Sequence, residues 1–88
     1  MADLTLDLTK YIDQTFFSGQ YPHVRGHRIR VSTIAYHARD NGWNIEELAR
    51  AFTLPRAEVL AALLYYQENQ AQIDALESAE RARYEQQT

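Results

Sequence analysis

Alternating apolar and polar residues open the chain. Leu4, Leu6 and Leu8 are each followed by one polar residue, which is the period of a half-buried β-strand. A second short extended segment is predicted at residues 11–12, and the polar residues 18–20 predict a turn. The first part of the chain is therefore expected to be β-like.

A tight hairpin is predicted over residues 24–31. Gly26 would lie at its bend, because glycine supplies the backbone freedom that such a turn requires. Beyond the bend, arginines alternate with β-branched residues. Their apolar side chains would point to one side and their guanidinium groups to the other.

Helical signals follow the hairpin. Ser32 is a suitable N-cap for a helix that begins at Thr33, and Asn41–Gly42 is a suitable C-terminal stop. Pro55 fits the first turn of a later helix, which meets no further breaker before about Tyr84. The last helix is therefore predicted to be too long for one small domain to bury.

Between these two helices lies a shorter one over residues 45–52. Asn44 and Glu47 have the spacing of a capping box, and apolar residues fall on one face of this segment. Together with the start of the next helix it resembles a helix-turn-helix over residues 45–64, although Thr53 replaces the usual turn glycine. The alternative is a plain helical hairpin whose second helix belongs to the core.

The predicted fold is α+β and mostly helical. Short N-terminal strands or a hairpin precede a three-helix, helix-turn-helix-like unit with a long C-terminal helix. A single domain is predicted over residues 1–76, followed by a polar helical tail over residues 77–88 whose end is frayed.

Composition and charge narrow the function. The 88 residues are 45% apolar and 24% charged, as in ordinary globular proteins, and they include no cysteine. The net charge of −3 argues against a large non-specific surface for nucleic acid. No signal peptide or membrane-length apolar run is visible, so we expect a cytoplasmic protein with no membrane contact. Because so small a core is marginal, a homodimer or higher homo-oligomer is expected.

No catalytic constellation is visible. The chain has no glycine-rich phosphate loop and no nucleophile motif. The three histidines His23, His27 and His37 lack further ligands at metal-binding spacing. We therefore expect a protein that is not an enzyme and that holds no cofactor or metal.

Basic side chains gather at the predicted hairpin. Three of the nine Lys and Arg residues lie between positions 25 and 30, where they could bind phosphate groups or could instead tie the hairpin to the fold. A further arginine opens the predicted second helix of the helix pair. The candidate DNA-binding residues are Arg25, Arg28, Arg30 and Arg56.

An apolar seam follows the predicted long helix. Its residues step by three and four positions and include one polar asparagine, as in a short coiled coil. The seam would bind a second copy or a partner, unless the helix packs on its own domain as far as Tyr66. The candidate interface residues are Val59, Leu63, Tyr66, Asn69, Ile73 and Leu76.

Three blocks occur in order along the chain. The first, residues 19–32, contains Gly-His-Arg-Ile-Arg-Val, the second has Gly42 followed by residues 45–49, and the third runs from Leu54–Pro55 to Tyr65–Tyr66. Together they resemble the domain-of-unknown-function family 433 (DUF433), in which a threonine stands at the place of His27. The resemblance covers roughly residues 11–76.

What the resemblance implies is a small bacterial or archaeal protein with a helix-turn-helix-like α+β fold. It also implies a dimeric antitoxin that binds and neutralises a PIN-like ribonuclease toxin, as in VapBC-type modules, and that binds its own operator DNA. Acidic residues of the C-terminal helix, Glu68, Asp74, Glu77 and Glu80, would then face a positively charged ribonuclease groove. The alternative is a protein-interaction or assembly module with no nucleic-acid binding.

Overall fold

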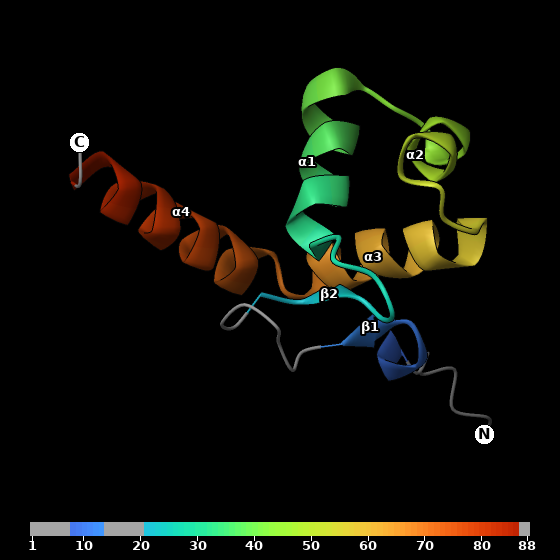
Figure 1. Ribbon diagram of the computed structural model, residues 1–88, viewed down its shortest axis with the longest axis horizontal. Helices are drawn as coiled ribbons and strands as arrows, with labels where there is room; N and C mark the ends of the chain where they lie inside the picture. Colours follow the sequence, from blue (N-terminus) through green and yellow to red (C-terminus); the bar gives the residue numbers. More distant parts are fainter. Residues whose placement is uncertain (1–7, 14–20, 87–88) are drawn as a thin grey trace.

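The computed structural model describes residues 8–13 and 21–86. Four α-helices follow a short 3₁₀ helix and a two-stranded sheet (Figure 1), so the prediction of a mostly helical α+β fold is confirmed. The elements are η1 (Leu8–Lys10), β1 (Ile12–Asp13), β2 (His23–Val24), α1 (Val31–Asn41), α2 (Ile45–Phe52), α3 (Arg56–Glu68) and α4 (Gln70–Gln86).

The sheet joins β1 to β2 in antiparallel register. Ile12 pairs with Val24, so two buried apolar side chains lie side by side on one face of the sheet. The segment predicted to be extended at residues 11–12 is thus partly confirmed. Of the strand predicted at the N-terminus, Leu8 and Thr9 lie instead in η1, and the other residues lie outside the described part of the chain.

The predicted bend at Gly26 is confirmed. Its φ is 84°, a left-handed angle that glycine adopts without strain. The amide of His27 donates to the carbonyl of Val24 at 2.9 Å, and the amide of Val24 donates to the carbonyl of Ile29 at 2.9 Å. The return arm forms only an isolated bridge, between His23 and Arg30. The main strand partner of β2 is therefore β1.

Helix α1 begins earlier than predicted. Its N-cap is Arg30, whose carbonyl accepts from the amide of Thr33 at 3.1 Å, so the prediction that Ser32 is the cap was wrong. Ser32 lies inside the first turn, is buried, and donates its hydroxyl to the carboxylate of Glu77. Gly42, with a φ of 68°, ends the helix as predicted.

Helix α2 has the predicted capping box. The amide of Glu47 donates to the side chain of Asn44 at 2.8 Å, and the Asn44 amide donates to the Glu47 carboxylate at 2.8 Å. Thr53 ends the helix with a φ of 55° and therefore occupies the position where a glycine would be expected. The turn from α2 to α3 consists of residues 53–55.

The long C-terminal helix is divided in two at Asn69, which corrects the prediction of one uninterrupted helix. The Asn69 side chain donates to the carbonyl of Tyr65 at 3.0 Å and so satisfies a terminal acceptor of α3. Its own carbonyl accepts from the amide of Ile73 at 3.0 Å and so begins α4. Asparagine competes with the helix for backbone groups in this way, whereas glycine and proline are the breakers that sequence reading looks for.

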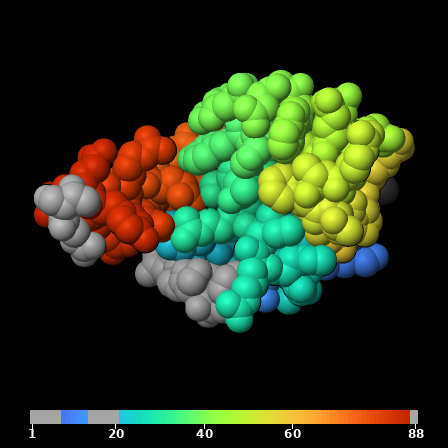
Figure 2. All heavy atoms as spheres, turned by 45° about the horizontal axis from the view of Figure 1, so that its top comes forward, coloured from blue at the N-terminus to red at the C-terminus, as the bar shows by residue number. Residues whose placement is uncertain are grey.

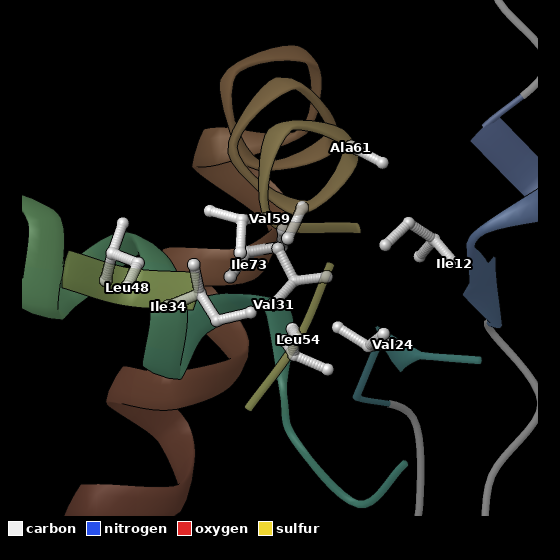
Figure 3. Packing of buried hydrophobic residues seen from close by; sticks show 10 residues of the cluster. Ile12, Val24, Val31, Ile34, Leu48, Leu54, Val59, Ala61 and Ile73 are labelled. Carbon is white, nitrogen blue, oxygen red and sulfur yellow. The ribbon is translucent and has the colours of Figure 1, made fainter. Parts of the chain in front are cut away.

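Helix α3 lies in the middle of the molecule, between the α1–α2 pair and the strands (Figure 1). Side chains from both strands, from α1, α2 and α4, and from the turn before α3 converge on its buried residues (Figure 3). Val59 and Ala62 are fully buried, as are Ile34 of α1 and Leu48 of α2. This arrangement favours the interpretation of the helix pair as a hairpin whose second helix belongs to the core.

Replacing Asn44 by alanine is expected to destabilise the fold by about 1 kcal/mol, because it removes the acceptor that caps α2. Asn44→Asp keeps an acceptor oxygen and is expected to retain most of the stability. Urea unfolding followed by circular dichroism measures both variants. An equal loss in the two would contradict the assigned role of the cap.

Candidate functional site

Arg30 anchors the middle of α4. Its guanidinium group donates to both carboxylate oxygens of Glu77, at 3.1 and 3.2 Å, and lies 3.2 Å from the carboxylate of Glu80. It also stacks 3.9 Å above the ring of Tyr21. Ser32 adds a hydroxyl bond of 2.6 Å to Glu77. Two successive turns of α4 are thereby held against the start of α1.

A second anchor lies one turn earlier on α4. The carboxylate of Asp74 accepts hydroxyl bonds from Tyr36 at 2.7 Å and from Tyr66 at 2.9 Å. The two rings meet edge to face, with centroids 5.9 Å apart. Asp74 therefore links α4 to both α1 and α3.

These contacts change the acidity of the groups involved. The hydroxyl of Tyr36 holds the pKa of Asp74 below its ordinary value of 3.8, and the hydroxyl of Tyr21 lowers the pKa of Glu80 in the same way. Burial raises the pKa values of Tyr36 and Tyr66. All four groups therefore keep their ordinary charge states near neutral pH, and the anchors are intact there.

The last turns of α4 leave the body of the protein. Residues 81–86 are all exposed, and the helix stands out as an arm in both whole-molecule views (Figures 1 and 2). Tyr84 lies on this arm with 67% of its surface exposed. The predicted boundary between residues 76 and 77 falls inside α4, where Glu77 is bound to Arg30 and Ser32. We call residues 81–86 the distal arm.

Arg25, a candidate DNA ligand, is bound within the fold. Its guanidinium group donates to the carbonyl of Thr9 at 3.0 and 2.8 Å and to the carbonyl of Ile12 at 3.3 Å. It also lies 3.4 Å from the carboxylate of Asp13. These bonds hold η1 and β1 beside the hairpin, which is a structural task.

The other candidate arginines lie in different surroundings. Arg30 is bound to α4, Arg56 forms an ion pair with Glu46 of α2, and Arg28 is exposed beside the bend. Arg25, Arg30 and Arg56 thus have carboxylate partners on three different elements.

The histidines also lie apart. The Nδ1 of His37 donates to the carbonyl of Thr33 at 2.8 Å, and its ring packs against those of Trp43 and Phe52. His27 lies 3.5 Å from the carboxylate of Glu58. Within residues 8–13 and 21–86, no three histidine, aspartate or glutamate side chains are grouped so that they could hold a metal ion.

The predicted interface seam faces the protein's own core. Val59 and Ile73 are buried, and Tyr66 is bonded to Asp74. Asn69 forms the break between α3 and α4. The two remaining members, Leu63 and Leu76, are partly buried. Most of the seam is therefore occupied within one copy of the chain.

A different face of α3 is open. Apolar side chains of α3 form one side of a groove of about 400 Å³, and residues of η1 together with Tyr11, which precedes β1, form the other. Leu60, 53% exposed, is the large aliphatic side chain that the described part of the chain leaves most open. The groove is lined by Leu8, Lys10, Tyr11, Ala57, Leu60, Ala61 and Leu64.

Sequence reasoning missed this groove because α3 is apolar on nearly every side. The spacing of its members, at i, i+3, i+4 and i+7 from Ala57, is itself a helical stripe. The stripe could have been noticed from the sequence, but not distinguished from the buried one.

Replacing Asp74 by asparagine is expected to cost about 1–2 kcal/mol near neutral pH, because a neutral amide accepts weaker bonds than a carboxylate. The lowered pKa of Asp74 gives stability that is complete above its ordinary value of 3.8 and is lost as the pH falls through the lowered value. The difference in stability between the variant and the wild type should therefore shrink as the pH falls below the ordinary value of 3.8.

Urea unfolding at a series of pH values measures this difference. Glu68→Gln removes the same charge from an exposed position and serves as the control. A constant difference between Asp74→Asn and wild type at every pH would contradict the role of the carboxylate.

No helix in the described residues is both long enough and apolar enough to cross a membrane. No curated protein and no solved structure matches the chain significantly. A family model does match, over residues 12–66. The matched segment runs from β1 to the last turn of α3 and does not include α4. The match spans more than half of the sequence, and the chain belongs to the family described as Protein of unknown function (DUF433).

Proposed function

We propose that this protein works by binding another protein with the distal arm of α4, as the antitoxin-like member of a toxin–antitoxin pair. The observation that carries the proposal is the exposed Tyr84 on a helix that extends beyond the body. The resemblance described above supplies the partner class, a PIN-like ribonuclease. Binding, and not catalysis, is the proposed activity.

The arm is suited to binding because it lacks a packing surface of its own. Helices without a packed face are marginal in water, and a partner would supply that face. The part of α4 that precedes the distal arm is already fixed by Arg30 and by the Asp74 anchor. Binding of a partner therefore costs less conformational entropy. An exposed tyrosine offers a large contact area with few rotatable bonds.

The charges of the distal arm change how a partner is expected to be recognised. Of the four acids expected to face a basic partner, Asp74, Glu77 and Glu80 already have partners inside the protein. The distal arm itself carries Arg81, Arg83 and Glu85. Its recognition is therefore proposed to rest on Tyr84 with mixed charges around it, and not on a surplus of negative charge.

Operator binding is the weaker part of the antitoxin interpretation. Arg25, Arg30 and Arg56 would have to break bonds to carboxylates or carbonyls before they could bind phosphate. This engagement favours the alternative module, one that binds protein without nucleic acid.

Tyr84→Ser is expected to weaken binding of the proposed partner, a PIN-like ribonuclease from the same organism, by about tenfold or more, the effect of removing an aromatic anchor. The measurement is isothermal titration with the purified ribonuclease, together with its residual RNA cleavage. Gln72→Ser, at an exposed position on the root of α4, is the matched control and should bind as wild type does. Equal binding by wild type and Tyr84→Ser would contradict the role of the arm.

Operator fragments from upstream of the gene are expected not to be retained in a gel shift at about 50 mM salt, where phosphate contacts are strongest. The opposite result would be retention of the fragment that is lost in Arg28→Ala, since Arg28 is an exposed arginine of the hairpin cluster. That outcome would restore DNA binding to the proposed function.

A further inference from the structure

The apolar groove between α3 and η1 has a buried floor and an exposed rim. Ala61 lies at its floor, only 5% exposed, and points to the side of the molecule where Ile12 lies (Figure 3). Leu8 and Leu64 are half-buried on the two walls, whereas Leu60 is 53% exposed at the rim. The groove is therefore an apolar recess that opens to solvent beside Leu60.

The wall opposite α3 is fixed by hydrogen bonds. The amide of Tyr11 donates to the carbonyl of Leu8 at 2.9 Å, and the amide of Arg25 donates to the carbonyl of Tyr11 at 2.7 Å. The guanidinium group of Arg25 also binds the carbonyl of Thr9, at 3.0 and 2.8 Å. The groove is therefore formed before any ligand arrives, so binding does not require this wall to become ordered.

Two polar groups belong to the same wall. The ammonium group of Lys10 lies 5.7 Å from the centre of the Tyr11 ring, and both residues line the groove. Lys10 is exposed, and the hydroxyl of Tyr11 is a further hydrogen-bond donor. Among the lining residues that the structure describes there is no carboxylate. An apolar recess thus lies beside a cation and a hydroxyl, which is complementary to an apolar chain with a negative end.

The extent of the exposed apolar surface favours a small ligand over a protein. A stable protein interface covers about 800 Å² on each partner. In residues 8–13 and 21–86, the large hydrophobic side chains that are exposed are Leu60 and Tyr84, and Tyr84 lies on the distal arm. The groove, at about 400 Å³, is within the range of small-molecule pockets, which are mostly apolar with a few polar groups that orient the ligand.

We propose that the groove binds an aliphatic chain that ends in an anionic head group, such as a medium-length alkyl carboxylate. The alkyl chain covers Leu60 and Leu64, and the head group binds the ammonium of Lys10 through a charge-assisted hydrogen bond. An amphiphile with a cationic head group is repelled by the same ammonium. The groove and the distal arm lie on different helices, so the inference is independent of what the arm binds.

Isothermal titration of the full chain with octanoate, 1-octanol and octylammonium tests the head group, and octanoate is expected to bind most tightly. Lys10→Gln should weaken octanoate by about two- to fivefold, the range for an exposed ion pair, and leave 1-octanol unchanged. Arg50→Gln removes the same charge from an exposed position of α2 outside the groove and should bind octanoate as wild type does. Decanoate, below its micelle-forming concentration, should bind about tenfold more tightly than octanoate because its chain covers more apolar surface.

A blocked groove tests the location. Ala57→Phe places a ring in the groove from an exposed position of α3 and should abolish binding of decanoate. Ala51→Phe adds the same ring at an exposed position of α2 and should leave binding unchanged, and both variants should keep their helical circular dichroism. Equal affinity for the three head groups overturns the anionic ligand, and decanoate binding that survives Ala57→Phe overturns the site. Absence of saturable binding by the wild type, with the groove filled by another part of the chain or by a protein, overturns the whole proposal.

Discussion

Arg30 holds helix α4 against the start of α1. Its carbonyl starts α1, its guanidinium group binds Glu77 and Glu80 on α4, and its planar face lies on Tyr21. An isolated ion pair on a surface contributes little, but here one arginine is held by two carboxylates and a ring while 28% of its side chain is exposed. Without this cluster, α4 would be attached mainly through Ile73 and Asp74.

The contacts of Arg30 also explain why the roles of the hairpin arginines could not be assigned from the sequence. A run of arginines on a hairpin is equally typical of phosphate binding and of structural ties, and their carboxylate partners are distant in sequence. Arg30 and Glu77 are separated by 47 positions. Local spacing cannot reveal such a pair, whereas the i to i+3 capping box of Asn44 and Glu47 is fully visible in the sequence and was predicted correctly.

The same distinction between local and distant causes applies to the helices. The stop at Gly42 and the break after α2 depend on neighbouring residues, and both were predictable. The start of α1 was not, because the hydroxyl of Ser32 is taken by Glu77 from α4. The division at Asn69 has a local cause, but the side chain of asparagine permits either continuation or termination. Tertiary packing of Ile73 against the core accompanies the second outcome.

Helix α3 shows how one apolar helix can serve two purposes. Val59 and Ala62 face the core, while Leu60 and Leu64 line the groove on another side. A helix that is apolar on all sides is expected to be covered on all sides, but its sequence does not show which part of the chain or which partner covers each side. In this protein the core covers one side of α3, whereas Leu60 stays exposed in the groove on another side. The groove and the distal arm lie on different helices, so a substitution in one surface need not disturb the other.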